Sequence, residues 1–331
     1  MLTASETVSA EQWAAEEFSG ASLPDKRLVK RLVKIAAHFA QAPTASLPKA
    51  SGSWKDTKGA YRFFDHDGVS AAAILQPHQA QTGRRMAEQP TALVVQDTTG
   101  LNFADHPGTQ GLGLVGTGRR GALGIWLHGS LAFTPEGAAW GVVAAQWWVR
   151  DPKQFGKAAR RHRRPIEEKE SYRWLQSYQA TVAWAKEHPG TRFVNIADRE
   201  GDLYELFALA GQHPEVGVLV RARHERSDSS GAKLSQLLAL QAPAGTLEID
   251  VPRKPGPAGQ AGGHLHAPEP ESSATAKSGA AVEFVGGGGA GDAAPWQSTK
   301  ALVLAAGDQC SGAGFCGGGR ADWMVSAALV H

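Results

Sequence analysis

The chain has 331 residues, of which 42% are hydrophobic and 20% charged, enough to bury the core of one large domain or two smaller ones. Its net charge of +2 conceals a split: residues 1–254 carry 31 basic and 26 acidic side chains, and residues 255–331 carry 3 and 6. Both cysteines lie in the second part, which excludes a disulfide scaffold and a four-cysteine zinc site. No stretch reaches the roughly 20 apolar residues that span a bilayer, and the N-terminus lacks the pattern of a signal peptide. We therefore expect a cytoplasmic protein of bacterial type.

Residues 11–75 are predicted to be helical. Asp25 can cap a helix whose apolar positions recur at helical spacing. Residues 26–62 contain nine Lys or Arg and a single acid, and aromatic residues are interleaved with the basic ones. This pattern favours phosphate binding, although a solvated basic face would look similar. The candidate DNA-binding residues are Arg27, Lys30, Arg31, Lys34, Lys55, Lys58 and Arg62.

The following segments alternate strands and helices. A strand is predicted at 91–103 and a hairpin at 124–150. The two tryptophans Trp147 and Trp148 near the end of the hairpin are expected in the core rather than in a platform that stacks on bases. The glycines between these segments follow the strand at a distance and open no helix, so no nucleotide cofactor is expected. A helix at 166–187 and a strand at 191–198 come next, followed by the remaining predicted segments 201–210, 216–222, 231–240 and 245–251. The order is that of an α/β protein.

Two aspartates each close an apolar strand, Asp97 in the first and Asp198 about a hundred residues later. Carboxylates at strand ends need a positive partner, and hard oxygen ligands select Mg²⁺ or Mn²⁺. Two such ions can activate an attacking oxygen and stabilise a leaving one in phosphodiester chemistry. The alternative is that each aspartate only caps the turn that follows it.

Residues 255–331 differ in composition from the preceding part, with 16 Gly and 17 Ala among 77 residues. Such a segment buries too little apolar area to offset the entropy of ordering, so a disordered tail is expected. A coding sequence read out of frame after about residue 254 would produce similar text.

Four stretches carry a resemblance to a known family: residues 16–40 with 51–65, 94–103, 111–133, and 196–206 with 219–224. They resemble the DDE transposases of bacterial insertion sequences, in the cut-and-paste, hairpin-forming branch of insertion-sequence family four. The resemblance implies a helical domain at 1–75 that binds transposon ends and an RNase H-like mixed-sheet core at 76–254. It implies Asp97 and Asp198 as catalytic ligands of Mg²⁺ or Mn²⁺, and Arg221 as a contact to the DNA backbone. It also implies double-stranded end and target DNA as partners, a homodimer, no membrane, and association with the bacterial nucleoid when bound.

The family's third metal ligand is a glutamate in a Tyr-x2-Arg-x3-Glu-x6-Lys motif, and no tyrosine of this chain has an arginine three residues later. We therefore predict a chain that binds DNA but is catalytically incompetent or nearly so. Two alternatives remain open. One is a truncated, non-catalytic relative that inhibits transposition, and the other is an RNase H-like nuclease in which Asp105, Glu200 or Asp202 completes a cluster of three carboxylates.

Overall fold

The computed structural model describes residues 8–115, 122–150, 164–227 and 230–239, together with three short strands at 246–249, 274–277 and 301–304. The described residues fall into two compact units, one up to Asn195 and the other from Ile196 onward. The predicted tail lies outside the described residues, apart from two of the short strands, so its disorder stays a prediction.

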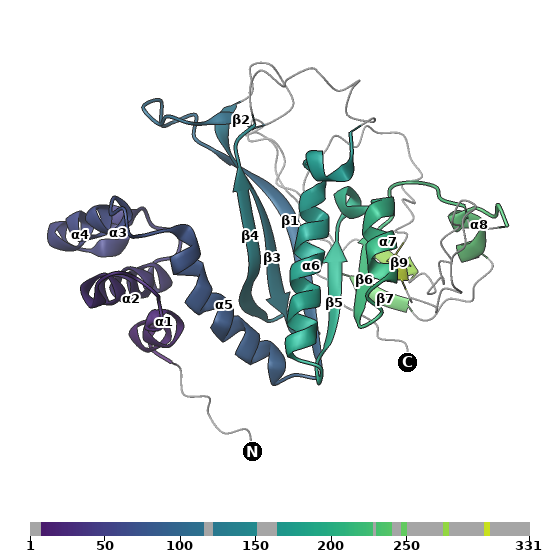
Figure 1. Ribbon diagram of the computed structural model, residues 1–331, viewed down its shortest axis with the longest axis horizontal. Helices are drawn as coiled ribbons and strands as arrows, with labels where there is room; N and C mark the ends of the chain where they lie inside the picture. Colours follow the sequence, from purple (N-terminus) through teal and green to yellow (C-terminus); the bar gives the residue numbers. More distant parts are fainter. Residues whose placement is uncertain are drawn as a thin grey trace, which may run out of the picture. The chain divides into compact units, whose positions relative to one another are not determined.

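The first unit begins with helices, as predicted from the sequence (Figure 1). Side chains of Ser9, Asp25, Ser53 and Ser70 accept backbone N–H groups at the starts of four of them, which satisfies donors that a helix leaves unpaired. The helices are α1 (Ala10–Phe18), α2 (Lys26–Gln41), α3 (Leu47–Ser51), α4 (Trp54–Phe64) and α5 (Ala71–Ala87). The predicted boundary between residues 75 and 76 falls inside α5, and it stays a prediction.

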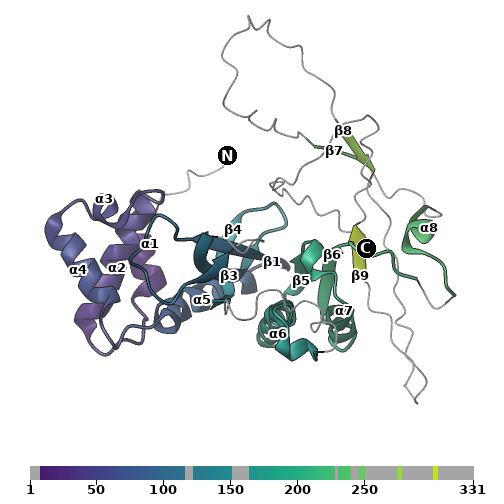
Figure 2. The same cartoon turned by 90° about the horizontal axis from the view of Figure 1, so that it is seen from above.

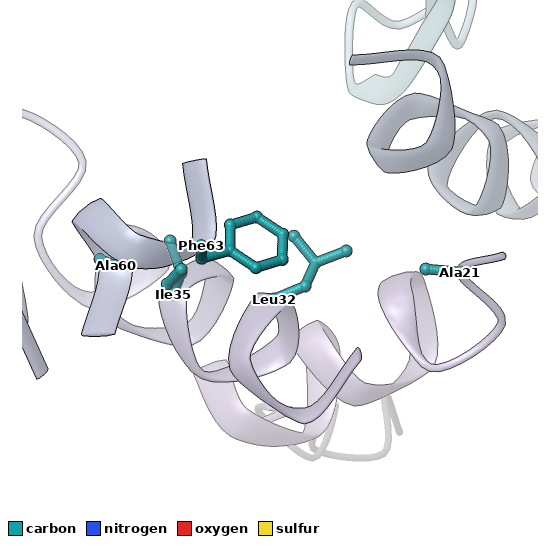
Figure 3. Close-up of a cluster of buried hydrophobic side chains, with 5 residues drawn as sticks. All are labelled: Ala21, Leu32, Ile35, Ala60 and Phe63. Carbon is teal, nitrogen blue, oxygen red and sulfur yellow. The ribbon is translucent and has the colours of Figure 1, made fainter. Parts of the chain in front are cut away.

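Helices α1 to α4 gather into one cluster with its own apolar core (Figure 2). Leu32 and Ile35 from α2 meet Ala60 and Phe63 from α4, and Ala21 closes the cluster after α1 (Figure 3). Each of these side chains is buried, because both helices repeat apolar residues every three to four positions. The core fixes α4 against α2.

The sheet of the first unit is built mainly from a long antiparallel arrangement. Strands β1 (Thr91–Asn102) and β4 (Ala139–Trp148) pair with opposite edges of β3 (Ala122–Phe133). The short β2 (Gly113–Val115) pairs with the start of β3, and β5 (Arg192–Ala197) is the neighbour of β1 on its other side. The predicted hairpin is confirmed, with its turn at residues 134–138.

Helix α6 (Tyr172–Glu187) contacts β1, β3 and β4 (Figure 1). The predicted helix from residue 166 begins six residues later than expected, because Ile166–Glu168 forms a separate short 3-10 helix, η3. Side chains from α6 bond to the face of the sheet that carries Gln146 and Asn195. On that face Gln96, His128 and Asn195 are at most 1% exposed. On the other face Asp97 and Trp147 are exposed.

The second unit continues the alternation of strands and helices. Its elements are η4 (Arg199–Gly201), α7 (Tyr204–Gly211), β6 (Val216–Arg221) and α8 (Leu234–Ala239). Strand β9 (Ala301–Leu304) pairs parallel with β6, and β7 (Thr246–Ile249) pairs antiparallel with β8 (Ala274–Lys277). The chain is therefore a mixed α/β protein with a helical N-terminal region, as predicted, while the RNase H-like topology stays a prediction. Among the described helices, none has the length and apolarity needed to cross a membrane.

Candidate functional site

Helix α4 presents a basic and aromatic face to solvent. At about 100° per residue, its positions 54, 55, 58, 61 and 62 fall within an arc of about 120°. Trp54 is 76% exposed and Tyr61 53% exposed, and the basic side chains of Lys55, Lys58 and Arg62 are also exposed. The opposite face supplies the buried residues Thr57, Ala60 and Phe63. Cations beside exposed aromatic rings on one helix face can contact both the phosphates and the bases of DNA.

The turn before α4 sets where this face begins. Gly52 has a φ of 66°, a left-handed conformation that glycine adopts without a steric penalty. Ser53 then caps α4, since its Oγ accepts the backbone N–H of Asp56 at 3.1 Å and donates to the Asp56 carboxylate at 2.8 Å. This reciprocal cap explains the start of α4 one residue after Ser53.

The candidate DNA-binding residues of α2 differ in their contacts. Arg27 pairs with Asp25 at 2.8 Å, Lys34 pairs with Asp56 at 2.6 Å, and the guanidinium of Arg31 lies against Gly59 of α4. The hydrogen bonds from Lys34 and Ser53 hold the pKa of Asp56 below its usual value. Lys30 is exposed. Two of the candidate DNA-binding residues, Arg31 and Lys34, therefore link α2 to α4.

Asp97 lies in β1 with an exposed side chain, directly opposite Gly129 of β3. The same face of the sheet carries Trp147, which is 51% exposed, so the expectation of a core position for Trp147 is wrong. Trp148 points to the other face and stacks on Trp126 with the ring centroids 6.2 Å apart. The sheet separates the two adjacent indoles because successive side chains of a strand point to opposite faces.

The residue before Asp97 belongs to a buried polar network that the sequence analysis missed. Gln96 donates to the side-chain oxygen of Asn195 in β5 and accepts from Nε2 of His128 at 3.1 Å. Asn195 in turn donates to Thr181 of α6 at 3.0 Å, and Thr98 bonds to Nδ1 of His128 at 2.8 Å. Polar residues at buried positions of two apolar strands were the available signal, since such groups need partners.

Asp198 belongs to the second unit and Asp97 to the first, so the predicted convergence of the two carboxylates stays a prediction. Asp198 is half-buried, and its Oδ1 accepts the backbone N–H of Glu200 at 2.8 Å. It therefore caps η4, as one reading of the sequence proposed. The cap engages Oδ1 of Asp198. The other oxygen of the same carboxylate is Oδ2. Arg221 is half-buried and is the last residue of β6.

Asp202 is a buried carboxylate in the described part of the second unit. It accepts the backbone N–H groups of Arg223 at 2.6 Å and His224 at 2.8 Å, and it pairs with the guanidinium of Arg226. Burial raises the pKa of Asp202, but these hydrogen bonds lower it more, so the pKa lies below its usual value. Arg226 and the backbone thus hold Asp202 as the anchor of the turn after β6.

The described residues contain no group of three or more histidine, cysteine, aspartate or glutamate side chains arranged to hold a metal ion. Asp105 and Glu200 are exposed, and Asp202 is engaged by Arg226. The three-carboxylate cluster that would favour a nuclease is therefore not found within these parts of the chain.

Residues 10–69 match the family model described as transposase DNA-binding. The match covers α1 to α4, and it includes every candidate DNA-binding residue except Arg221. It extends over less than a fifth of the chain. It supports a transposase that binds DNA.

Proposed function

We propose that this chain is a transposase-family protein that binds transposon-end DNA for metal-dependent cleavage and strand transfer, and that its own cleavage activity is impaired. The observation that carries the proposal is the exposed basic and aromatic face of α4 inside the segment that matches the transposase DNA-binding model. The RNase H-like catalytic core and the homodimer rest on the resemblance of the sequence.

The DNA-binding step follows from charge and shape. Lys55, Lys58 and Arg62 project from one side of α4 and would neutralise phosphates on either side of a groove. Trp54 and Tyr61, on the same face, would reach base edges or sugars. An α-helix fits the major groove of DNA, where each base pair presents a distinct pattern of donors and acceptors. Helix α4 would therefore supply both affinity and sequence preference.

The proposed metal ligands are Asp97 and Asp198, each through a carboxylate oxygen. The donor chemistry fits Mg²⁺ or Mn²⁺, since Asp97 is exposed and Asp198 has a second oxygen besides the one that caps η4. A bound divalent ion would polarise a phosphoryl oxygen and generate the attacking hydroxide. Arg221 would hold the DNA backbone. The missing glutamate motif limits this chemistry in the present chain.

Binding without cleavage would make the chain an inhibitor that occupies transposon ends. The engagement of Asp202 by Arg226 speaks against the nuclease alternative, because Asp202 then serves as a structural anchor. The inhibitor reading and the impaired transposase share one DNA-binding surface and differ only in residual nicking.

The test is a titration of the full chain against a duplex that carries a transposon end and a scrambled duplex of equal length, at several salt concentrations. We expect tighter binding to the end duplex and a steep fall of both affinities with salt, because cations displace counterions from phosphates. Equal affinity for the two duplexes would contradict end recognition, and affinity independent of salt would contradict the basic surface.

A further inference from the structure

Gly59 leaves a notch in the surface of α4, and the guanidinium of Arg31 from α2 fills it. A Cβ atom added at Gly59 would overlap Nη1 of Arg31 and lie 2.6 Å from its Cζ, so any side chain at residue 59 would displace the guanidinium. Glycine weakens the interior of a helix relative to alanine. The contact with Arg31 gives a packing reason for glycine at this position.

The notch places Arg31 between two cations of α4. Lys55 precedes Gly59 by four residues and Arg62 follows it by three, and residues at these spacings are neighbours on a helix surface with Cβ atoms about 5–6 Å apart. Because Nη1 of Arg31 occupies the position of the missing Cβ atom, it lies within about 8 Å of the Cβ atoms of Lys55 and Arg62. The three cations therefore form a row about 10 Å long, which we call the Arg31 row.

The charges of the Arg31 row are not neutralised by the protein. None of its three members forms an ion pair within the part of the chain that the structure describes. Asp56 lies nearby on α4, but its carboxylate is already bound by Lys34 at 2.6 Å and by the hydroxyl of Ser53 at 2.8 Å. Like charges at short range repel one another, and the half-buried guanidinium of Arg31 has lost part of its hydration. A bound anion would relieve both costs.

We propose that the Arg31 row binds phosphates of one DNA strand beside the groove that α4 enters, and that Gly59 is the positioning residue that admits Arg31 to this site. A guanidinium presents a planar fork that can donate two hydrogen bonds to one phosphate. Lys55 and Arg62, on the two sides of the notch, hold the neighbouring phosphates. Helices α2 and α4 thus bind DNA through one shared surface. The proposal deepens the proposed function and rests on it.

The test measures the affinity of the full chain for a DNA duplex of arbitrary sequence at several salt concentrations, by fluorescence anisotropy. Gly59→Ala removes no charge, yet it should reduce the slope of log K against log salt by about 1, because the added Cβ atom moves Arg31 away from its phosphate. Arg31→Ala should give the same reduction. The double variant should lose no more than either single variant, since both changes remove the same contact.

Gly59→Ala should keep its fold, because the added Cβ atom meets only the far end of a flexible side chain and alanine favours a helix. Urea unfolding of each variant checks this expectation. Lys34→Ala is the matched control, since it removes a cation of α2 that is already paired with Asp56. It should leave the salt slope nearly unchanged.

An unchanged slope in a folded Gly59→Ala variant would overturn the proposal, and so would reductions that add in the double variant. An unchanged slope in Arg31→Ala would overturn it whether or not Gly59→Ala folds. If Arg31→Ala lowered the stability without changing the slope, Arg31 would serve only the packing of α2 on α4. Failure of the wild-type chain to bind any duplex would refute the proposed function itself, whereas the other outcomes leave that function intact.

Discussion

His128 is kept neutral by its surroundings. It is 1% exposed, and burial, with a smaller contribution from Arg173, lowers its pKa from 6.5 to about 4. The hydrogen bonds agree with a neutral ring, since Nε2–H donates to Gln96 and Nδ1 accepts from the Thr98 hydroxyl. Protonation would place an uncompensated charge in a buried site, which is costly.

Acidification should therefore weaken folding through His128. Between pH 6.5 and about 4 the unfolded chain binds a proton that the native state does not, so the free energy of unfolding falls as the pH falls. The loss amounts to on the order of 3 kcal/mol. His128→Gln retains hydrogen-bonding groups but cannot titrate, so its stability deficit relative to wild type should shrink from pH 7 to pH 4.5 in urea unfolding. A deficit that stays constant over this range would contradict the prediction, and the exposed His106→Gln is the control.

Single residues also show what sequence patterns can reveal. The cap at Asp25 was predictable, because an N-cap and the backbone N–H that it accepts lie within one turn. The pairing of Lys34 with Asp56 was not, because these residues are brought together only when α2 packs on α4. The sequence therefore predicts a DNA-binding role for Lys34 but does not show that Lys34 pairs with Asp56.

The basic and aromatic face of α4 should supply contacts to DNA phosphates. Lys58→Ala with Arg62→Ala should lower the affinity for duplex DNA and reduce the slope of log K against log salt by about 2, one for each lost phosphate contact. Lys34→Ala is the matched control, since it removes a cation of the same region that is already paired with Asp56. It should leave the salt slope nearly unchanged. Equal reductions of the slope by both changes would mean that α4 has no special role in binding.

Whole elements were predictable where their periodicity is local. The strand with Asp97, the hairpin after it and the N-terminal helices are all present, because alternation and helical spacing are properties of adjacent residues. The exposure of Trp147 was not predictable, since it depends on which face of the sheet α6 covers. Hydrophobicity alone suggested a core position for an indole that faces solvent.

At the scale of the first unit, a buried carboxylate ties the helical region to the sheet. Glu17 of α1 accepts from Nδ1 of His78 at 2.7 Å and pairs with Arg85, both on α5, while Nε2 of His78 accepts the backbone N–H of Val142 in β4 at 2.9 Å. Burial raises the pKa of Glu17, but the hydrogen bonds and charges of His78 and Arg85 lower it by a larger amount. The pKa therefore lies below its usual value, and the carboxyl group stays ionised. No sequence pattern joins residues so far apart, although each is a polar residue in an amphipathic helix.

Across the whole molecule, the basic surface and the proposed metal ligands belong to different elements, α4 on one hand and β1 or the start of η4 on the other. DNA binding should therefore not need a divalent ion. Chelation with EDTA should leave the affinity for an end duplex unchanged, and Asp97→Ala should bind equally well or slightly better because a negative charge near phosphate is removed. Fluorescence anisotropy measures both affinities. Clear loss of binding in Asp97→Ala would contradict its role as a metal ligand.

Cleavage is tested separately, and a denaturing gel should show little nicking of the end duplex with Mg²⁺ or Mn²⁺. Robust nicking that Asp97→Ala abolishes would support the role of Asp97 as a metal ligand and refute the expected catalytic defect.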